Sequence, residues 1–268
     1  MATLGPLGIA TGLDSKPASL AAAALVEQLG FSTLWLTGGP LPGLQTVTDV
    51  LDATSTMTIG TGILSVSKYP AADVSALYES HKASGRLVLG LGGAYGPHPV
   101  RQIDAYLDSL EAVPVEDRML AALGPRMLTL ARNRTAGSLP VLVTPEYVAQ
   151  ARTILGPGKL LAVEQLVILE TDPARARSIA REPLGFMGRI PAYAASFRRM
   201  GFTEEECENL DDRLVDSVIA WGDDTAIANR IAALRAAGAD HVALSVLTGQ
   251  TGPQPLTQWR HLSQTLLP

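Results

Sequence analysis

"MTIGTGIL" (residues 57–64) reads as a strand of a protein core, except that Gly60 and Gly62 stand in its middle. A glycine inside a strand packs no side chain and loses more backbone entropy than any other residue. Successive residues of a strand point to opposite faces, so these two glycines share one face. The stretch therefore predicts a core strand with one bare face, against which a flat group could lie.

Seven other short apolar runs accompany this strand. They are LGIA (7–10), TLWLT (33–37), LVLGLG (87–92), MLAAL (119–123), VLVT (141–144), LLAVEQLVIL (160–169) and HVALSVL (241–247). Stretches with helical spacing separate them, such as SLAAAALVEQLG (19–30) and DDTAIANRIAALRAAGAD (223–240). Nearly continuous apolar runs are typical of parallel strands buried on both faces. Eight such strands alternating with helices predict an α/β fold, a (βα)8 TIM barrel that spans 1–268 as a single domain. A doubly wound sheet is the alternative.

The stretch from Thr171 to Trp221 departs from this alternation because it is helical throughout and rich in aromatic residues. We expect a helical insertion between strands seven and eight. An insertion at this place either covers the mouth of the barrel or adds packing helices. The sequence leaves both interpretations open.

The bulk properties exclude several classes of protein. A net charge of −5 and a pI near 5.4 argue against nucleic acid as a partner, because phosphate binding needs a basic surface. No apolar run reaches 18 residues and the N-terminus lacks a signal-peptide pattern, so we expect a cytoplasmic protein with no membrane partner. The single cysteine, Cys207, excludes an intrachain disulfide. The surrounding acidic residues should raise its pKa, so we expect no catalytic role for it.

In a barrel of this kind the site lies at the carboxyl ends of the strands. These ends are rich in glycine and poor in acids and bases, as in TGGP (37–40) and LGG (91–93). Such ends suit a large ligand that approaches the backbone closely and supplies the reactivity itself. LGLGG (89–93) does not match the spacing of a dinucleotide-binding loop.

Two strand-to-helix junctions could bind an anion. ALGPRML (122–128) places Gly124 and Pro125 in a first helical turn and adds the charge of Arg126, while VTPEY (143–147) places Thr144 at an N-cap. Taken singly, each junction is more simply explained as ordinary helix capping. Because they follow adjacent strands, together they predict a shared phosphate site.

Of the four histidines, only His98 follows a strand on the expected side, which makes it a weak candidate for an acid or base. His81, His241 and His261 are expected to be structural or solvated. No pair has the spacing of metal ligands, so we expect no metal. A Gly-x-Ser-x-Gly nucleophile motif is also absent from the sequence.

Several segments, in order, resemble the luciferase-like monooxygenase superfamily, and within it most closely the oxidoreductases that use the deazaflavin coenzyme F420. They are GTGI (60–63), ASGRLVLGLGG (83–93), ALGPRMLTLA (122–131), LVTPE (142–146), DRLVDSVIAWGD (212–223) and AGADHVALSVL (237–247). The resemblance implies a luciferase-like barrel whose mouth holds the cofactor ring. It also implies a cis peptide bond between Gly62 and Ile63 behind that ring.

The resemblance implies a set of cofactor-binding residues at the strand ends. They are Thr37, Gly38, Gly62, Ile63, Gly92, Gly93, Leu123, Gly124, Pro125, Arg126 and Thr144. The reaction it implies is hydride transfer between the deazaflavin and a small organic substrate. Relatives that use FMN instead activate oxygen on a flavin reduced by a separate reductase.

The sequence departs from this family just after strand two. Many F420-dependent dehydrogenases carry an acid and a histidine there, whereas this chain reads LTGGPLPG (36–43). The hydroxyl group of Thr37 can donate a hydrogen bond, but it is a weak candidate for a catalytic base. This argues against alcohol oxidation and favours reduction of an activated double bond or imine. The catalytic residues therefore stay unassigned.

Three hypotheses follow from the sequence. The first is an F420-dependent oxidoreductase, acting as a homodimer on a small-molecule substrate. The second is an FMN-dependent monooxygenase of the same fold. The third is a barrel that has lost catalysis and serves as a binding protein.

Overall fold

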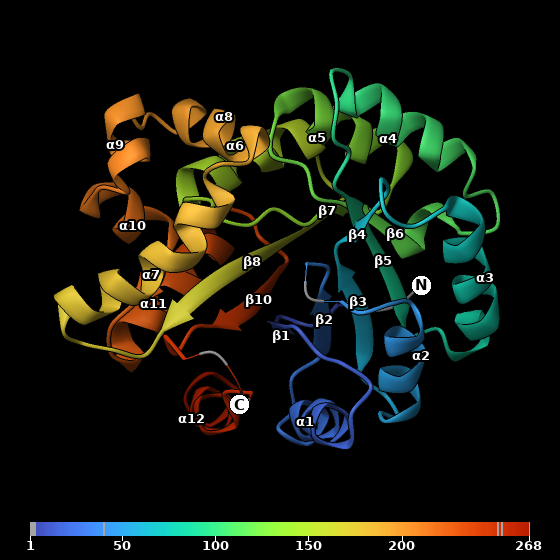
Figure 1. Ribbon diagram of the computed structural model, residues 1–268, viewed down its shortest axis with the longest axis horizontal. Helices are drawn as coiled ribbons and strands as arrows, with labels where there is room; N and C mark the ends of the chain where they lie inside the picture. Colours follow the sequence, from blue (N-terminus) through green and yellow to red (C-terminus); the bar gives the residue numbers. More distant parts are fainter. Residues whose placement is uncertain (1–3, 40, 251, 253, 268) are drawn as a thin grey trace.

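The computed structural model describes residues 4–39, 41–250, 252 and 254–267. Within them, parallel strands close into a barrel, because β10 pairs with β8 on one side and with β1 on the other (Figure 1). In order around the barrel the strands are β1 (Leu7–Thr11), β2 (Thr33–Thr37), β3 (Thr58–Gly62) continued by β4 (Leu64–Ser65), β5 (Leu87–Gly92), β6 (Arg118–Leu120), β7 (Gly137–Ser138), β8 (Leu160–Ile168) and β10 (His241–Val246). The predicted (βα)8 barrel is confirmed.

Helices surround the barrel strands (Figure 1). They are α1 (Pro17–Gln28), α2 (Gln45–Asp52), α3 (Ala71–His81), α4 (Pro99–Asp108), α5 (Pro125–Arg134), α6 (Pro145–Leu155), α11 (Asp224–Ala236) and α12 (Leu256–Leu266). Several begin with proline at the first helical position, where its missing N–H costs no hydrogen bond. Short 3-10 turns at Lys82–Ser84 and Val115–Asp117 precede β5 and β6. None of the helices in the described ranges is long and apolar enough to cross a membrane.

The sixth strand was expected at 141–144, which is wrong, because the sixth strand of the barrel begins four residues earlier, at Gly137. The structure pairs Gly137 and Ser138 with β6 and β8 instead, and of 141–144 only Val141 forms an isolated bridge. Gly137 fits there because a Cβ atom on it would lie 1.8 Å from the carbonyl oxygen of Leu160. Leu142 has a positive φ of 56°, which no strand residue adopts.

The inside of the barrel is closed by the indole ring of Trp35. The ring lies over Gly60, where a Cβ atom would come within 2.3 Å of its Cε3 atom. Its Nε1–H donates to Nε2 of the buried His241 over 3.0 Å, and the Nδ1–H of His241 donates to the carbonyl oxygen of Gly5 over 2.5 Å. Burial lowers the pKa of His241 to about 4, so the imidazole is neutral at pH 7.

This arrangement corrects half of the expectation for the glycine strand. Gly60 and Gly62 share the inner face as predicted, but the ring that covers Gly60 belongs to Trp35 of the protein itself. A Cβ atom on Gly62 would lie at an ordinary 3.7 Å from its nearest neighbours, so Gly62 is less crowded than Gly60 and is only partly buried.

The predicted helical insertion is confirmed and consists of α7 (Pro173–Met187), α8 (Pro191–Arg199), α9 (Glu204–Asn209) and α10 (Asp212–Val218). Its apolar residues pack on Leu142, Leu166 and Ile168, so it covers the inner face of the carboxyl half of β8. A short strand, β9 (Ala220–Trp221), then pairs with the end of β8. The insertion therefore lies on the mouth side of the barrel.

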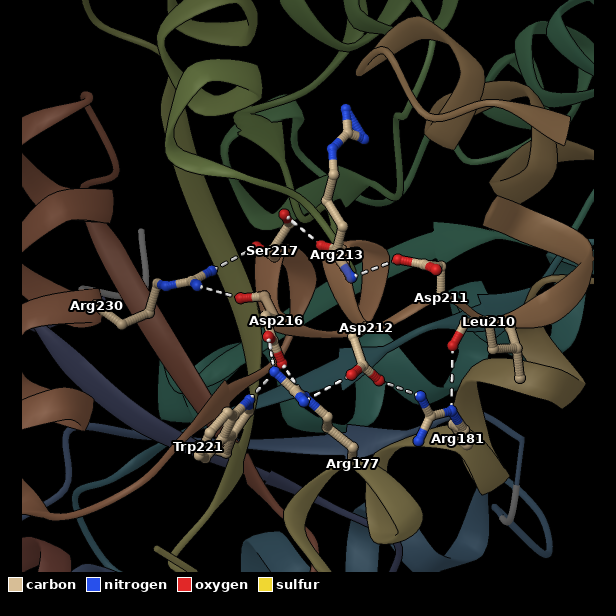
Figure 2. Close-up of polar contacts among 10 residues, drawn as sticks. All are labelled: Arg177, Arg181, Leu210, Asp211, Asp212, Arg213, Asp216, Ser217, Trp221 and Arg230. Carbon is tan, nitrogen blue, oxygen red and sulfur yellow. Dashed lines mark hydrogen bonds and ion pairs between the residues drawn. The ribbon is translucent and has the colours of Figure 1, made fainter. Parts of the chain in front are cut away.

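Charged residues fasten the insertion together (Figure 2). Arg177 of α7 forms a bidentate pair with Asp216 of α10, with N–O distances of 3.1 and 2.6 Å, and also contacts Asp212 at 2.6 Å. Arg181 binds the other oxygen of Asp212, and Trp221 donates to Asp216 over 2.8 Å. These half-exposed pairs join α7 to α10.

The contact between Gly60 and Trp35 yields a stability prediction. We expect Gly60→Ala to lower the free energy of unfolding by about 1–3 kcal/mol, because the added methyl group forces the indole out of its position. Urea unfolding followed by tryptophan fluorescence measures this change. Gly43→Ala is the matched control, since a Cβ atom there meets no atom within 4 Å. Equal stability of the two variants would contradict the packing described.

Candidate functional site

The carboxyl ends of β2 and β3 bring together four of the predicted site residues. Thr37 pairs with Gly62, and the N–H of Gly38 donates to the carbonyl oxygen of Gly62 over 3.2 Å. The peptide bond between Gly62 and Ile63 is cis, as the family resemblance implies. A Cβ atom on Gly38 would lie 1.6 Å from the oxygen of Ile63, so Gly38 is required by the backbone itself.

The end of β5 lies beside the surface formed by Gly62 and Ile63, which we call the ledge. Gly92 is buried because the side chain of Ile63 lies on it, 3.3 Å from where a Cβ atom would be. Gly93 has a positive φ of 64°, and its carbonyl oxygen accepts from the hydroxyl group of Ser65 over 3.0 Å. The exposed part of the ledge is therefore formed by Gly62 and Ile63, with Thr37 at its side.

The N-terminus of α5 faces the same side of the barrel. Gly124 is its N-cap, in extended backbone, and no side chain caps the helix there. Pro125 and Arg126 are exposed, as expected for residues that open a helix. The first-turn N–H groups and the helix dipole make this end attractive to an anion.

Arg199 of the insertion reaches this helix end. Its Nη2 atom donates to the carbonyl oxygen of Leu123 over 3.2 Å and lies 3.6 Å from the position of a Cβ atom on Gly124. A guanidinium group carries five N–H donors, so a contact with one carbonyl leaves others for a ligand. The insertion thus adds a cation to the helix end that the sequence singled out.

The N-terminus of α6 differs, because it already holds an anion. The carboxylate of Glu146 accepts hydrogen bonds from its own backbone N–H and from the hydroxyl group of Thr144, which lowers its pKa. Thr144 also accepts from the N–H of Tyr147 over 3.3 Å, and Tyr147 donates to the carbonyl oxygen of Ala122 over 2.9 Å. The two helix ends are therefore adjacent, as expected, but only α5 has no acid of its own at its end.

An ionisable group that the sequence reasoning did not single out lies on β8. Glu164 keeps some exposed surface, yet burial raises its pKa to about 7, opposed by a hydrogen bond from Ser245. Tyr193 of α8 lies close enough to interact with it, and burial together with Glu164 raises the pKa of Tyr193. The one signal in the sequence was a lone acid inside the apolar run LLAVEQLVIL.

The other candidates lie away from this ledge or have structural partners. His98 is exposed at the start of α4. His81 contacts the hydroxyl group of Thr48 at 2.9 Å, and His261 contacts Asp224 at 2.6 Å. Burial and then nearby carboxylates raise the pKa of Cys207, as expected. Within the described ranges, histidines, cysteines and acids form no group of three that could hold a metal ion.

Comparison with known structures defines the class of fold. F420-dependent tetrahydromethanopterin reductase from Methanopyrus kandleri superposes with a TM-score of 0.75, at 16% identity, over 99% of each chain. An F420-dependent secondary alcohol dehydrogenase bound to an F420–acetone adduct gives 0.74, at 14% identity, over 98% of each chain. The FMN-bound oxygenating constituent of 3,6-diketocamphane monooxygenase from Pseudomonas putida gives 0.69, at 10% identity, over 98% of each chain. The fold is the luciferase-like (βα)8 barrel that these enzymes share.

Sequence comparison adds one curated relative. A protein of Mycobacterium tuberculosis, provisionally named a coenzyme F420-dependent oxidoreductase, is 25% identical over 286 aligned positions, which cover 75% of this chain and 82% of that protein. No protein-family model matches the sequence. The resemblance drawn from the motifs is confirmed, since the structural neighbours are F420-dependent reductases and monooxygenases and the relative bears an F420-dependent name.

The carboxyl group of Glu164 yields a prediction about stability and pH. Its pKa is about 7 in the folded protein and near 4.5 in the unfolded chain, so between these values the folded state binds more protons. Stability should therefore fall as pH rises from 5 to 8, by up to about 3 kcal/mol. Glu164→Gln should remove this loss and be more stable than the wild-type protein at pH 8.

Urea unfolding at several pH values measures the effect. Glu182→Gln, which removes the same charge from an exposed position on α7, should follow the wild-type curve. If Glu164→Gln shows the same pH dependence as Glu182→Gln, the carboxyl group of Glu164 is not desolvated.

Proposed function

We propose that this protein is an oxidoreductase that transfers a hydride between the deazaflavin coenzyme F420 and a small organic substrate. The observation that carries the proposal is the N-terminus of α5, which lacks a side-chain cap and has Arg199 beside it on the mouth side of the barrel. It offers a phosphate group both N–H donors and a formal charge. The names of the Mycobacterium tuberculosis relative and the Methanopyrus kandleri reductase favour F420.

The residues present fit such a cofactor. The ledge of Gly62 and Ile63 gives a flat ring a surface without a projecting side chain on the glycine. Leu123, Gly124, Pro125 and Arg126, together with Arg199, would hold the phosphate group. When bound, the deazaflavin supplies the hydride, while the protein binds it, orients it and limits access of water.

Thr37, at the side of the ledge, favours reduction of the substrate over oxidation of an alcohol. Thr37 presents a hydroxyl group, which can donate a hydrogen bond but is a poor base at neutral pH. Reduction of an activated double bond or imine needs a proton donor instead of a base. We therefore propose that the substrate is an activated alkene or imine.

Three of our expectations stay predictions. Thr37 and His98 stay weak catalytic candidates, and we expect the protein to form a homodimer and to work in the cytoplasm. FMN is the alternative cofactor, because a neighbour of the same fold binds it.

Cofactor titration tests the proposal directly. Oxidised F420 and FMN are each added to the purified protein, and their fluorescence is followed at low and high salt. Micromolar binding of F420 alone supports the proposal, whereas binding of FMN alone favours the monooxygenase. Binding of neither at millimolar concentration overturns both and favours a barrel without catalysis.

A substitution at the N-cap of α5 tests the placement of the phosphate group. Gly124→Asp should weaken F420 binding about tenfold or more, because its carboxylate lies at the helix end and can pair with Arg199. Gly124 has φ −108° and ψ 158°, so other residues fit its backbone. Gly124→Asn, of equal size and without charge, is the control. Equal affinities of the two variants would show that the phosphate group binds elsewhere.

Arg199 can be tested against its neighbour. Arg199→Ala should weaken F420 binding about tenfold through loss of a charged hydrogen bond. Arg198→Ala removes the same charge one residue earlier in α8, from a side chain that lines a separate hollow beside Cys207. If both variants bind F420 with the same affinity, Arg199 acts only through its charge and does not contact the phosphate group.

A further inference from the structure

Glu164 lies between the closed interior of the barrel and the insertion. Two residues before it on the same face of β8, Ala162 belongs to the apolar layer around Trp35. Two residues after it, Leu166 is covered by the insertion helices. Since a strand rises about 3.3 Å per residue, the carboxyl-bearing residue stands about 7 Å above the closed layer.

The backbone connects Glu164 to the ledge of Gly62 and Ile63. Leu139 lies 3.7 Å from where a Cβ atom on Gly62 would be. The next residue, Pro140, accepts a hydrogen bond at its carbonyl oxygen from the N–H of Glu164 over 2.9 Å. Leu139 and Pro140 therefore connect the ledge to the strand that carries Glu164.

Among the described residues, a hydroxyl group and a tyrosine interact with the carboxyl. Ser245 of β10 donates a hydrogen bond to it. Tyr193 of α8 interacts with it, and Tyr95, from the loop after β5, interacts with Tyr193 in turn. His241 lies deeper on β10, opposite Ala162, where Trp35 and Gly5 occupy both of its nitrogens.

We propose that Glu164 is the proton donor of the barrel mouth, which rests on the hydride-transfer function proposed above. The hydride adds to the electrophilic carbon of the substrate's C=C or C=N bond, and the π electrons of that bond move to the neighbouring atom. That atom takes the proton of the Glu164 carboxyl group. The resulting carboxylate, stabilised by Ser245, is protonated again from solvent.

The roles of the three residues are distinct. Glu164 is the catalytic residue, since its proton goes to the substrate. Ser245 is a positioning residue that holds one carboxyl oxygen. Tyr193 interacts with the carboxyl from α8, and burial is the main cause that raises the pKa of Glu164.

The first measurement follows the titration of Glu164 itself, without and then with the cofactor. The glutamate carboxyl groups are labelled with ¹³C and titrated by NMR, and Glu164→Gln identifies the signal by its loss. We expect a midpoint near pH 7, moved upwards in Ser245→Ala, which loses the hydrogen bond that favours the carboxylate. Saturation with oxidised F420 should also move the midpoint upwards, because the ring excludes water. A midpoint below pH 5, or one that F420 leaves unchanged, would overturn the inference.

The second measurement uses reduced F420 with a panel of activated alkenes and imines, beginning with 2-cyclohexen-1-one. Glu164→Gln should lower kcat about a hundredfold or more while its Kd for F420 stays within about twofold. The kcat of the wild-type protein should decrease as the pH rises above the NMR midpoint. In Ser245→Ala the same decrease should occur at higher pH. Glu182→Gln should retain both kcat and its pH profile.

The two proposals fail differently. Unchanged kcat in Glu164→Gln, with F420 binding and turnover intact in the wild-type protein, overturns the proton donor alone. Loss of F420 binding in the wild-type protein, or absence of turnover across the panel, overturns the proposed function and with it this inference.

Discussion

The packing of Trp35 on Gly60 is the constraint on which the rest of the barrel depends. The indole ring fills the interior only because the neighbouring strand, β3, has no side chain at Gly60. Its N–H group binds His241, whose other nitrogen binds Gly5, so one polar chain links three parts of the barrel. A fully packed lower half leaves the carboxyl end as the side where a ligand can approach backbone.

Above this closed layer the mouth combines three kinds of surface. Gly62 and Ile63 form an apolar ledge, the start of α5 and Arg199 form a positive end, and Glu164 adds an acid whose pKa burial raises to about 7. The insertion contributes to the second and third of these through α8. Within the insertion, Arg177 pairs with the acids of α10 and so joins α7 to α10 (Figure 2).

The barrel was predictable because its strands are short apolar runs with regular spacing, and the helical character of 171–221 was equally plain. The sixth strand was misplaced because VLVT is apolar, whereas the true strand residues, Gly137 and Ser138, pair through close backbone contact and a hydroxyl group. The ledge at Gly62 could be predicted from its glycines and a resemblance. Arg199 and Tyr193 could not, because no local pattern says which residues of an insertion turn towards a distant strand. Glu164 was visible as a lone acid in an apolar run, but only the packing around it shows that burial raises its pKa.

The carboxylate of Glu146 at the N-terminus of α6 has a consequence for how a ligand can be oriented. Two neighbouring helix N-termini could have given an anionic ligand two equivalent binding sites. The ligand could then have bound in either orientation. Because Glu146 already occupies the end of α6, we proposed only the end of α5 for a negatively charged tail. A ring tethered at one end cannot turn over, so it shows the substrate a single face. For the proposed hydride transfer this means stereochemistry, since a prochiral carbon reduced in this mouth would give one enantiomer.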